Sequence, residues 1–260
     1  MIEILLAVAV VGAVALVAGV GLAFASKFLA VPADEKFEAV RAALPGANCG
    51  ACGFSGCDGY AEAIAKGEAE CNKCPVGGDK TAAELSEILG VEVVAVKKVA
   101  FVACGKTDEK TVLKYHYEGI NTCAAASLLY NGPLSCQFGC IGLGDCVTVC
   151  PQKAISVNDG AAKVDKDLCT GCGLCSKTCP KGLISILPAD FKYAVACSNK
   201  DKGGVAMKAC KSACIGCTKC AKNCPSGAIT ITDNLANINQ ELCTGCGECA
   251  KVCPNHCIVF

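Results

Sequence analysis

The stretch DLCTGCGLCSKTCP, residues 167–180, carries three cysteines separated by two residues each and a fourth directly before a proline. Three thiols on so short a loop can face one point, as a four-iron cubane requires of its thiolate ligands. The stretch ELCTGCGECAKVCP, residues 241–254, has the same pattern. The sequence therefore predicts iron–sulfur binding units that occur more than once.

Cysteine dominates the composition, since 26 of the 260 residues are Cys, against two His and no Trp. The formal net charge is zero, so there is no electrostatic case for nucleic-acid binding. Such a cysteine content is typical either of a disulfide scaffold or of soft-metal ligation in a reducing compartment. Repeated two-residue gaps closed by Cys-Pro favour metal clusters over disulfides.

The C-terminal half of the chain is an internal duplication with an offset of 74 residues, which carries Cys169 onto Cys243 and needs no gap. Cys123, Cys136, Cys140, Cys146, Cys150, Cys169, Cys172, Cys175 and Cys179 align in order with Cys197, Cys210, Cys214, Cys220, Cys224, Cys243, Cys246, Cys249 and Cys253. One position differs, because Leu143 stands where the second copy has Cys217. A duplication accounts for the alignment.

In two-cluster ferredoxins the cysteine before proline ligates the other cluster of its pair. That rule predicts three complete ligand sets. They are Cys150 with Cys169, Cys172 and Cys175; Cys253 with Cys214, Cys217 and Cys220; and Cys224 with Cys243, Cys246 and Cys249. Zinc ribbons also use Cys-x2-Cys pairs, but four-cysteine runs closed by proline favour [4Fe-4S] clusters.

A fourth set is incomplete, because the first copy has Leu143 in place of a cysteine. Its members are Cys140, Cys146 and Cys179. We predict Cys136 as the fourth ligand, since only three residues separate it from Cys140. Two alternatives stay open: a [3Fe-4S] cluster, or a different donor such as Cys123.

The stretch NCGACGFSGCDGYAEAIAKGEAECNKCPVGG, residues 48–78, forms another kind of unit. A glycine-rich loop carries Cys49, Cys52 and Cys57, and the fourth ligand is predicted as Cys74 rather than Cys71. This makes five [4Fe-4S] clusters. The cysteines left over are Cys71, Cys104, Cys123, Cys197, Cys210 and Cys257. We expect these to be small buried hydrophobes, although a Cys-x12-Cys pair recurs in both copies.

The N-terminus carries no charge from Ile4 to Ser26, a length sufficient to cross a bilayer. A cleaved signal peptide is the alternative, but no Lys or Arg precedes the run and the run is long for that class. Because Lys27, Lys36 and Arg41 follow it, we predict a single-pass anchor in the cell membrane with its N-terminus outside and the cluster domains cytoplasmic. The segment has no ionisable residue and so offers no ion path.

The predicted fold class is α+β. We expect a transmembrane anchor over 1–27, a small α-rich 4Fe-4S module over 33–92, a linking segment over 93–122, and tandem ferredoxin-like (βαββαβ) domains over 123–188 and 194–260. Helices are expected at 33–43 and 81–89, and a β-branched strand at 91–102.

The chain resembles the B subunit of the Rnf complex, in the longer form that has two ferredoxin-like domains. The resemblance rests on the order of an uncharged N-terminal helix, an LPGANCGACGFSGC…CNKCPVGG module and ferredoxin-like runs. The resemblance implies one component of a translocase that oxidises reduced ferredoxin, reduces NAD⁺ and pumps Na⁺ or H⁺. The B subunit would accept electrons from ferredoxin and pass them to partner subunits. Because the chain lacks a GxGxxG turn and a flavin attachment motif, we expect no NAD or flavin site in it.

Two other functions stay open. The first is a redox sensor or reductase scaffold, for example one that keeps a redox-sensitive transcription factor reduced. The second is a component of a corrinoid iron–sulfur system, because the N-terminal module also resembles a unit found there. The predicted anchor disfavours the second function.

Overall fold

The computed structural model describes residues 12, 14–22, 24, 35–91 and 97–260. The predicted membrane anchor, residues 1–27, falls largely outside these residues. Within the described part of the chain, no helix combines the length and apolar character needed to cross a membrane.

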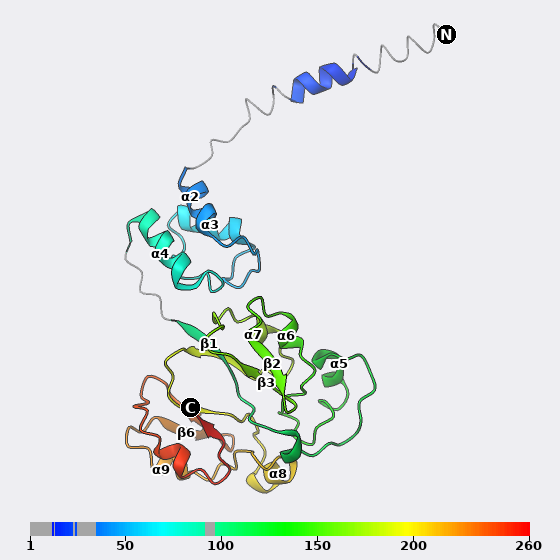
Figure 1. Cartoon of the computed structure of the whole chain (residues 1–260), viewed down its shortest axis with the longest axis vertical. Coiled ribbons are helices and arrows are strands. Elements are labelled where there is room, and N and C mark those ends of the chain that lie inside the picture. Colours follow the sequence, from blue (N-terminus) through cyan, green and yellow to red (C-terminus); the bar gives the residue numbers. More distant parts are fainter. Residues whose placement is uncertain (1–11, 13, 23, 25–34, 92–96) are drawn as a thin grey trace, which may run out of the picture.

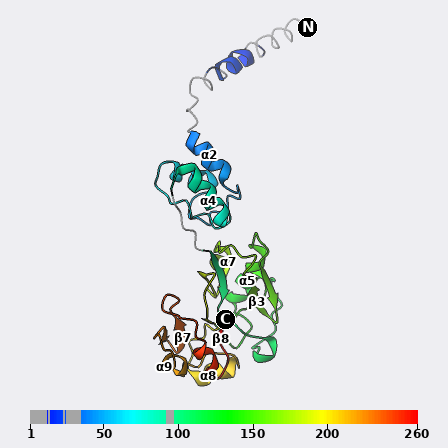
Figure 2. The same cartoon turned by 60° about the vertical axis from the view of Figure 1, so that its left-hand side comes forward.

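Three helices form the N-terminal module: α2 (Glu35–Ala43), α3 (Cys57–Ala65) and α4 (Gly78–Leu89). Helices α2 and α4 confirm the helices expected at 33–43 and 81–89. Their shared core contains Val40, Tyr60 and Leu85, all essentially buried. Burial of the Val40 and Leu85 side chains contributes about 1.5–3 kcal/mol each. Figures 1 and 2 show these helices gathered in one unit, separate from the strands that follow it.

The first ferredoxin-like unit has the order β-α-β-β-α-β. Its elements are β1 (Lys98–Val102), α6 (Asp145–Thr148), β2 (Ile155–Asn158), β3 (Ala161–Val164), α7 (Leu174–Thr178) and β4 (Ile184–Pro188). Strand β1 pairs antiparallel with β4, with Ala100 opposite Ile186, and β2 pairs with β3 as a hairpin. The unit therefore takes its first strand from the segment that the sequence predicts as a link.

The second unit repeats this order. Its elements are β5 (Ala194–Val195), α9 (Lys219–Lys222), β6 (Ile229–Thr232), β7 (Leu235–Ile238), α10 (Glu248–Lys251) and β8 (Ile258–Val259). Strand β5 pairs with β8 and β6 pairs with β7, both antiparallel. An additional helix, α8 (Gly203–Ala209), follows β5.

A long connecting segment, called the excursion below, runs from the end of β1 to the first cysteine loop, which begins at Cys140. It contains the short helices η1 (Asp108–Lys110) and α5 (Cys123–Leu128). The excursion reaches the second unit, where the Lys211 amide donates to the Lys110 carbonyl at 2.9 Å and Thr111 forms a β-bridge with Cys210. The two ferredoxin-like units are thus in contact (Figure 1).

The cores of both units contain small residues and cysteines more than large apolar side chains. The strands are only two to five residues long, and such small units bury little apolar surface on their own. Small domains of this kind commonly add a metal centre, whose binding free energy also stabilises the fold.

Candidate functional sites

The cysteine loops are shaped by glycines that no other residue can replace without strain. Gly142 in the first copy and Gly216 in the second have φ of +86° and +63°. A Cβ at Gly142 would lie 2.5 Å from the Gly160 carbonyl oxygen, and one at Gly216 would lie 2.8 Å from the Asn234 carbonyl oxygen. Each loop is therefore pressed against the turn of the following β-hairpin, and its cysteines are fixed relative to that hairpin.

The second unit contains two cavities lined by cysteines from the predicted sets. The Cys220 cavity is lined by Cys214, Cys217, Cys220 and Cys253, together with Cys257. The Cys249 cavity is lined by Cys224, Cys243, Cys246 and Cys249. In each cavity the cysteine before proline comes from the other run, which is the crossed arrangement expected from the spacing. Cys257 is an addition, and its Sγ lies 3.5 Å from that of Cys253.

The first unit has a corresponding cavity with a different fourth cysteine. This Cys146 cavity is lined by Cys123, Cys140, Cys146 and Cys179. Burial raises the pKa of the Cys146 thiol to about 12, and the neighbouring Cys140, Cys123 and Cys179 thiols add to the rise. The structure thus brings Cys123 to the incomplete set, whereas Cys136 does not line this cavity.

An aspartate explains the position of Cys123. The two carboxylate oxygens of Asp145 accept hydrogen bonds from the backbone amides of Cys123, at 2.7 Å, and of Ala124, at 2.9 Å. The start of α5 is therefore tied to the loop that carries Cys146. In the second copy the equivalent of Asp145 is Lys219, which cannot accept these bonds. This difference lies next to the Leu143 replacement, and it is the one signal in the sequence that favours Cys123.

The first unit also contains the predicted set of Cys150, Cys169, Cys172 and Cys175, and the first three of these cysteines lie around Cys175. Burial raises the pKa of the Cys175 thiol to about 11, and Cys172, Cys169 and Cys150 raise it further. Backbone amides point at two of the sulfurs: Ala100 donates to Cys169 Sγ and Ala154 to Cys150 Sγ, both at 3.3 Å. The structure therefore brings Cys150 together with the cysteines of the later run, as the crossed pattern predicts for this unit.

In the N-terminal module the cysteines Cys52, Cys57 and Cys74 are neighbours. Burial raises the pKa of the Cys74 thiol, and the Cys52 and Cys57 thiols contribute to the rise. Cys71 is buried in the helical core, with 5% of its surface exposed. The Tyr60 hydroxyl donates to the Glu70 carbonyl at 2.7 Å and accepts from the Lys73 amide at 3.0 Å, which fixes the turn that leads into Cys74. Cys49 is exposed on its loop.

A further cavity, the interdomain cavity, takes up cysteines that the crossed pattern leaves out. It is lined by Cys104, Cys136, Cys197 and Cys210. Cys136 and Cys210 also belong to one buried apolar cluster with Ala206, Ala209 and Ala213. The structure therefore places Cys136 with the leftover cysteines and not beside Cys146.

The donor sets fit iron–sulfur clusters in their chemistry. Cysteine thiolates are the ligands of [4Fe-4S] clusters, and amides that donate to sulfur stabilise the bound thiolates. Among the described residues, no three Cys, His, Asp or Glu side chains are grouped to hold one metal ion. A cubane has a different requirement, because each of its four thiolates binds a separate iron atom.

Comparisons with known proteins agree with this chemistry. A family described as "Putative Fe-S cluster" matches residues 44–76, and the 4Fe-4S dicluster domain matches residues 138–188 and 213–257. The chain is similar to the B subunit of the Na⁺-translocating ferredoxin:NAD⁺ oxidoreductase complex of Acetobacterium woodii, with 44% identity over 92% of this chain and 72% of the relative.

Two further relatives cover similar shares. The B subunit of the ion-translocating oxidoreductase complex of Methanosarcina acetivorans is 40% identical over 90% of this chain and 89% of its own. The B subunit of the proton-translocating ferredoxin:NAD⁺ oxidoreductase complex of Clostridium ljungdahlii is 39% identical over 93% of this chain and 85% of its own. The named relatives differ in the ion that they translocate.

Proposed function

The chain belongs to the family of B subunits of ion-translocating oxidoreductase complexes, and from this premise we propose that it is the electron-transfer subunit of a membrane-bound ferredoxin:NAD⁺ oxidoreductase. It accepts electrons from reduced ferredoxin and delivers them to partner subunits. The observation that carries this proposal is the series of cysteine-lined cavities along both ferredoxin-like units. Flavin and NAD⁺ chemistry and ion translocation belong to the partner subunits.

Five [4Fe-4S] clusters are proposed from the cysteine sets. Their ligands are Cys49, Cys52, Cys57 and Cys74; Cys123, Cys140, Cys146 and Cys179; Cys150, Cys169, Cys172 and Cys175; Cys214, Cys217, Cys220 and Cys253; and Cys224, Cys243, Cys246 and Cys249. Cys123 replaces Cys136 in the second set, because Cys123 lines the Cys146 cavity and Cys136 does not. When bound, each cluster takes up and releases one electron at a time.

The protein contributes binding, orientation and exclusion of water. Cys140, Cys146, Cys169, Cys175, Cys214, Cys220, Cys249 and Cys253 are buried. Burial raises the pKa of thiols such as Cys146, Cys175 and Cys220, so loading a cluster must release their protons. Amides such as those of Ala100 and Ala154 then donate to the thiolates and raise the reduction potential, because they stabilise negative charge on sulfur.

The membrane attachment is part of the proposal. Residues 1–27 act as a single-pass anchor with the N-terminus outside, and the cluster domains face the cytoplasm. The support is the uncharged run from Ile4 to Ser26, followed by Lys27, Lys36 and Arg41. This arrangement keeps the thiolates in a reducing compartment and within reach of a soluble ferredoxin.

An anaerobic stopped-flow experiment on the intact complex tests the function. Reduced ferredoxin should bleach the visible iron–sulfur absorption of this protein, and NAD⁺ should then restore it. A Cys249→Ala variant should slow ferredoxin-dependent NADH formation strongly, whereas Cys71→Ala should not, because Cys71 lies outside the proposed ligand sets. Unchanged bleaching and NADH formation in the Cys249→Ala complex would contradict the proposal.

A further inference from the structure

We propose that Cys104, Cys136, Cys197 and Cys210 hold an additional [4Fe-4S] cluster between the two ferredoxin-like units. All four line the interdomain cavity. They come from both copies of the duplication and from the excursion after β1, so no single sequence motif contains them. Cys104 follows β1, Cys197 follows β5, and Cys210 ends helix α8.

The walls of the cavity are held together across the two units by backbone and hydroxyl hydrogen bonds. The Gly105 amide donates to the Ala196 carbonyl at 2.8 Å. The Ser198 hydroxyl donates to the Ala103 carbonyl at 3.0 Å. These bonds join the residue before Cys104 and the residue after it to the residues on either side of Cys197, so the two cysteines are positioned as a pair.

The cavity resembles the proposed cluster cavities in size. Its empty volume, including the open space at its mouth, is about 340 Å³, against about 350 Å³ for the Cys220 cavity, about 410 Å³ for the Cys146 cavity and about 290 Å³ for the Cys249 cavity. Four cysteines around a space of this size are the donor set of a cubane.

Buried polar groups line this cavity in a way that suits a negatively charged cluster. Asn199 is only 1% exposed. Its side-chain Nδ2 donates to Cys136 Sγ at 3.5 Å, and its backbone amide donates to Cys197 Sγ at 3.4 Å. Lys106 is 5% exposed, and its ammonium lies 3.5 Å from a carboxylate oxygen of the largely exposed Asp108. The carboxylate that pairs with this buried ammonium is itself mostly in solvent, and four thiolates around an iron–sulfur core would supply further negative charge on the cavity side.

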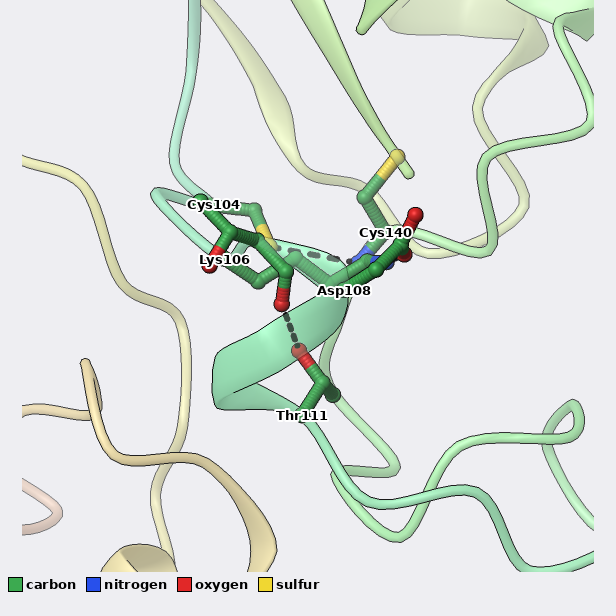
Figure 3. Close-up of polar contacts among 6 residues, drawn as sticks. Cys104, Lys106, Asp108, Thr111 and Cys140 are labelled. Atoms are coloured by element: carbon green, nitrogen blue, oxygen red, sulfur yellow. Dashed lines mark hydrogen bonds and ion pairs between the residues drawn. The ribbon is translucent and has the colours of Figure 1, made fainter. Parts of the chain in front are cut away.

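Hydrogen bonds from a backbone amide to a cysteine sulfur also connect the interdomain cavity to a proposed cluster site in each unit. The Cys140 amide donates to Cys104 Sγ at 3.4 Å (Figure 3). The Cys214 amide donates to Cys197 Sγ at 3.2 Å. Cys140 and Cys214 are equivalent in the duplication, and their own thiols line the Cys146 and Cys220 cavities. The interdomain cavity thus adjoins one proposed cluster site in each unit.

This placement assigns a bridging role to the four cysteines. An electron that leaves a reduced centre in one unit reaches an oxidised centre in the other through the additional site, with no bond made or broken. The bridging role rests on the proposed electron-transfer function, whereas the presence of the cluster does not.

Quantification of iron, acid-labile sulfide and zinc in the anaerobically purified full chain tests the site. Six cubanes give about 24 irons and about 24 sulfides per chain, and five give about 20 of each. The double variant Cys136→Ala/Cys210→Ala should lose about four irons and about four sulfides, with a matching decrease in the integrated EPR signal of the reduced protein. The matched control is Ser198→Ala, which alters the same wall but removes no thiol, and it should keep the full content.

Several results would overturn the site. One is about 20 irons in the wild-type chain; another is an unchanged iron content in the double variant; a third is zinc that disappears with these cysteines in place of iron and sulfide. A Cys104→Ala variant provides a second check outside the duplicated cysteines, and it should also reduce the iron content. A chain with about 20 irons that ferredoxin still reduces would overturn the additional site and leave the proposed function intact.

Discussion

The two copies of the duplication place equivalent cysteines in different sites. Cys123 and Cys197 occupy the same position in the repeat, yet Cys123 lines the Cys146 cavity of its own unit and Cys197 lines the interdomain cavity. The loop beside them differs at two positions, with Leu143 and Asp145 in the first copy against Cys217 and Lys219 in the second. In the first copy the Asp145 carboxylate accepts the amides of Cys123 and Ala124, and Cys123 lies in the local site, whereas its counterpart Cys197 lies in the shared one.

The largest expected effect comes from exchanging these cysteines for alanine. Cys123→Ala should remove the fourth ligand of the Cys146 cavity and leave a [3Fe-4S] cluster or no cluster there. Cys197→Ala should leave the clusters of the second unit intact and affect only the interdomain site. EPR of the oxidised proteins distinguishes the variants, since only Cys123→Ala should give a three-iron signal from the Cys146 cavity. A three-iron signal that appears with Cys136→Ala, and not with Cys123→Ala, would refute the assignment.

A second substitution makes the second copy resemble the first. Cys217→Leu is combined with Cys257→Ala, because Cys257 also lines the Cys220 cavity. Lys219 cannot hold Cys197 in their place, so the chain should lose either the whole cubane, about four irons, or about one iron if a three-iron cluster remains. The reciprocal variant, Leu143→Cys combined with Cys123→Ala, should recover a four-iron centre in the first unit. Iron quantification checks both, and failure of the reciprocal variant to recover iron would show that the two loops are not equivalent.

The glycines of the loops should have a moderate effect on stability. Gly142→Ala combines a positive φ with a Cβ 2.5 Å from the Gly160 carbonyl oxygen, so the protein should be destabilised by about 2–5 kcal/mol. Gly182→Ala is the matched control, because Gly182 also has a positive φ but a Cβ added there would meet no atom within 4 Å. It should cost about 1–2 kcal/mol. Thermal bleaching of the visible absorption would measure both, and equal shifts would contradict the packing argument.

The smallest expected effect concerns the cap itself. Asp145→Ala removes the acceptor of the Cys123 and Ala124 amides and should cost about 0.5–2 kcal/mol. It should also increase the fraction of three-iron signal after mild oxidation, because Cys123 is less firmly held. Lys219→Ala changes the equivalent exposed residue of the second copy and should alter neither quantity. A stability loss without any spectroscopic change would mean that Asp145 only stabilises α5.

Much of the site was predictable from the sequence because the repeated runs place their cysteines locally. The crossed sets of the second unit, such as Cys253 with Cys214, Cys217 and Cys220, follow from spacing and the glycine loops alone. The spacing of cysteines shows which thiols are close enough along the chain to share a site, but it does not show which way each thiol points. Cys136 is close enough in sequence to join Cys140, but its thiol lies on the other side, against α8.

Long-range contacts account for the rest. Strand β1 pairs with β4 across more than eighty residues, and Cys104 reaches its cavity only because that pairing fixes the start of the excursion. Nothing near Cys104 in the sequence marks it as a ligand. The helices α2 and α4, in contrast, are predictable from the local spacing of their apolar residues. Helix α4 also ends at Gly90, a residue type common after a helix C-terminus.

An anomalous difference map at the iron edge, from crystals of the anaerobically purified chain, locates the clusters relative to the cysteines. We expect one iron cluster surrounded by Cys123, Cys140, Cys146 and Cys179, and a separate one surrounded by Cys104, Cys136, Cys197 and Cys210. Iron bound jointly by Cys136 and Cys140, with none between the two units, would contradict this expectation.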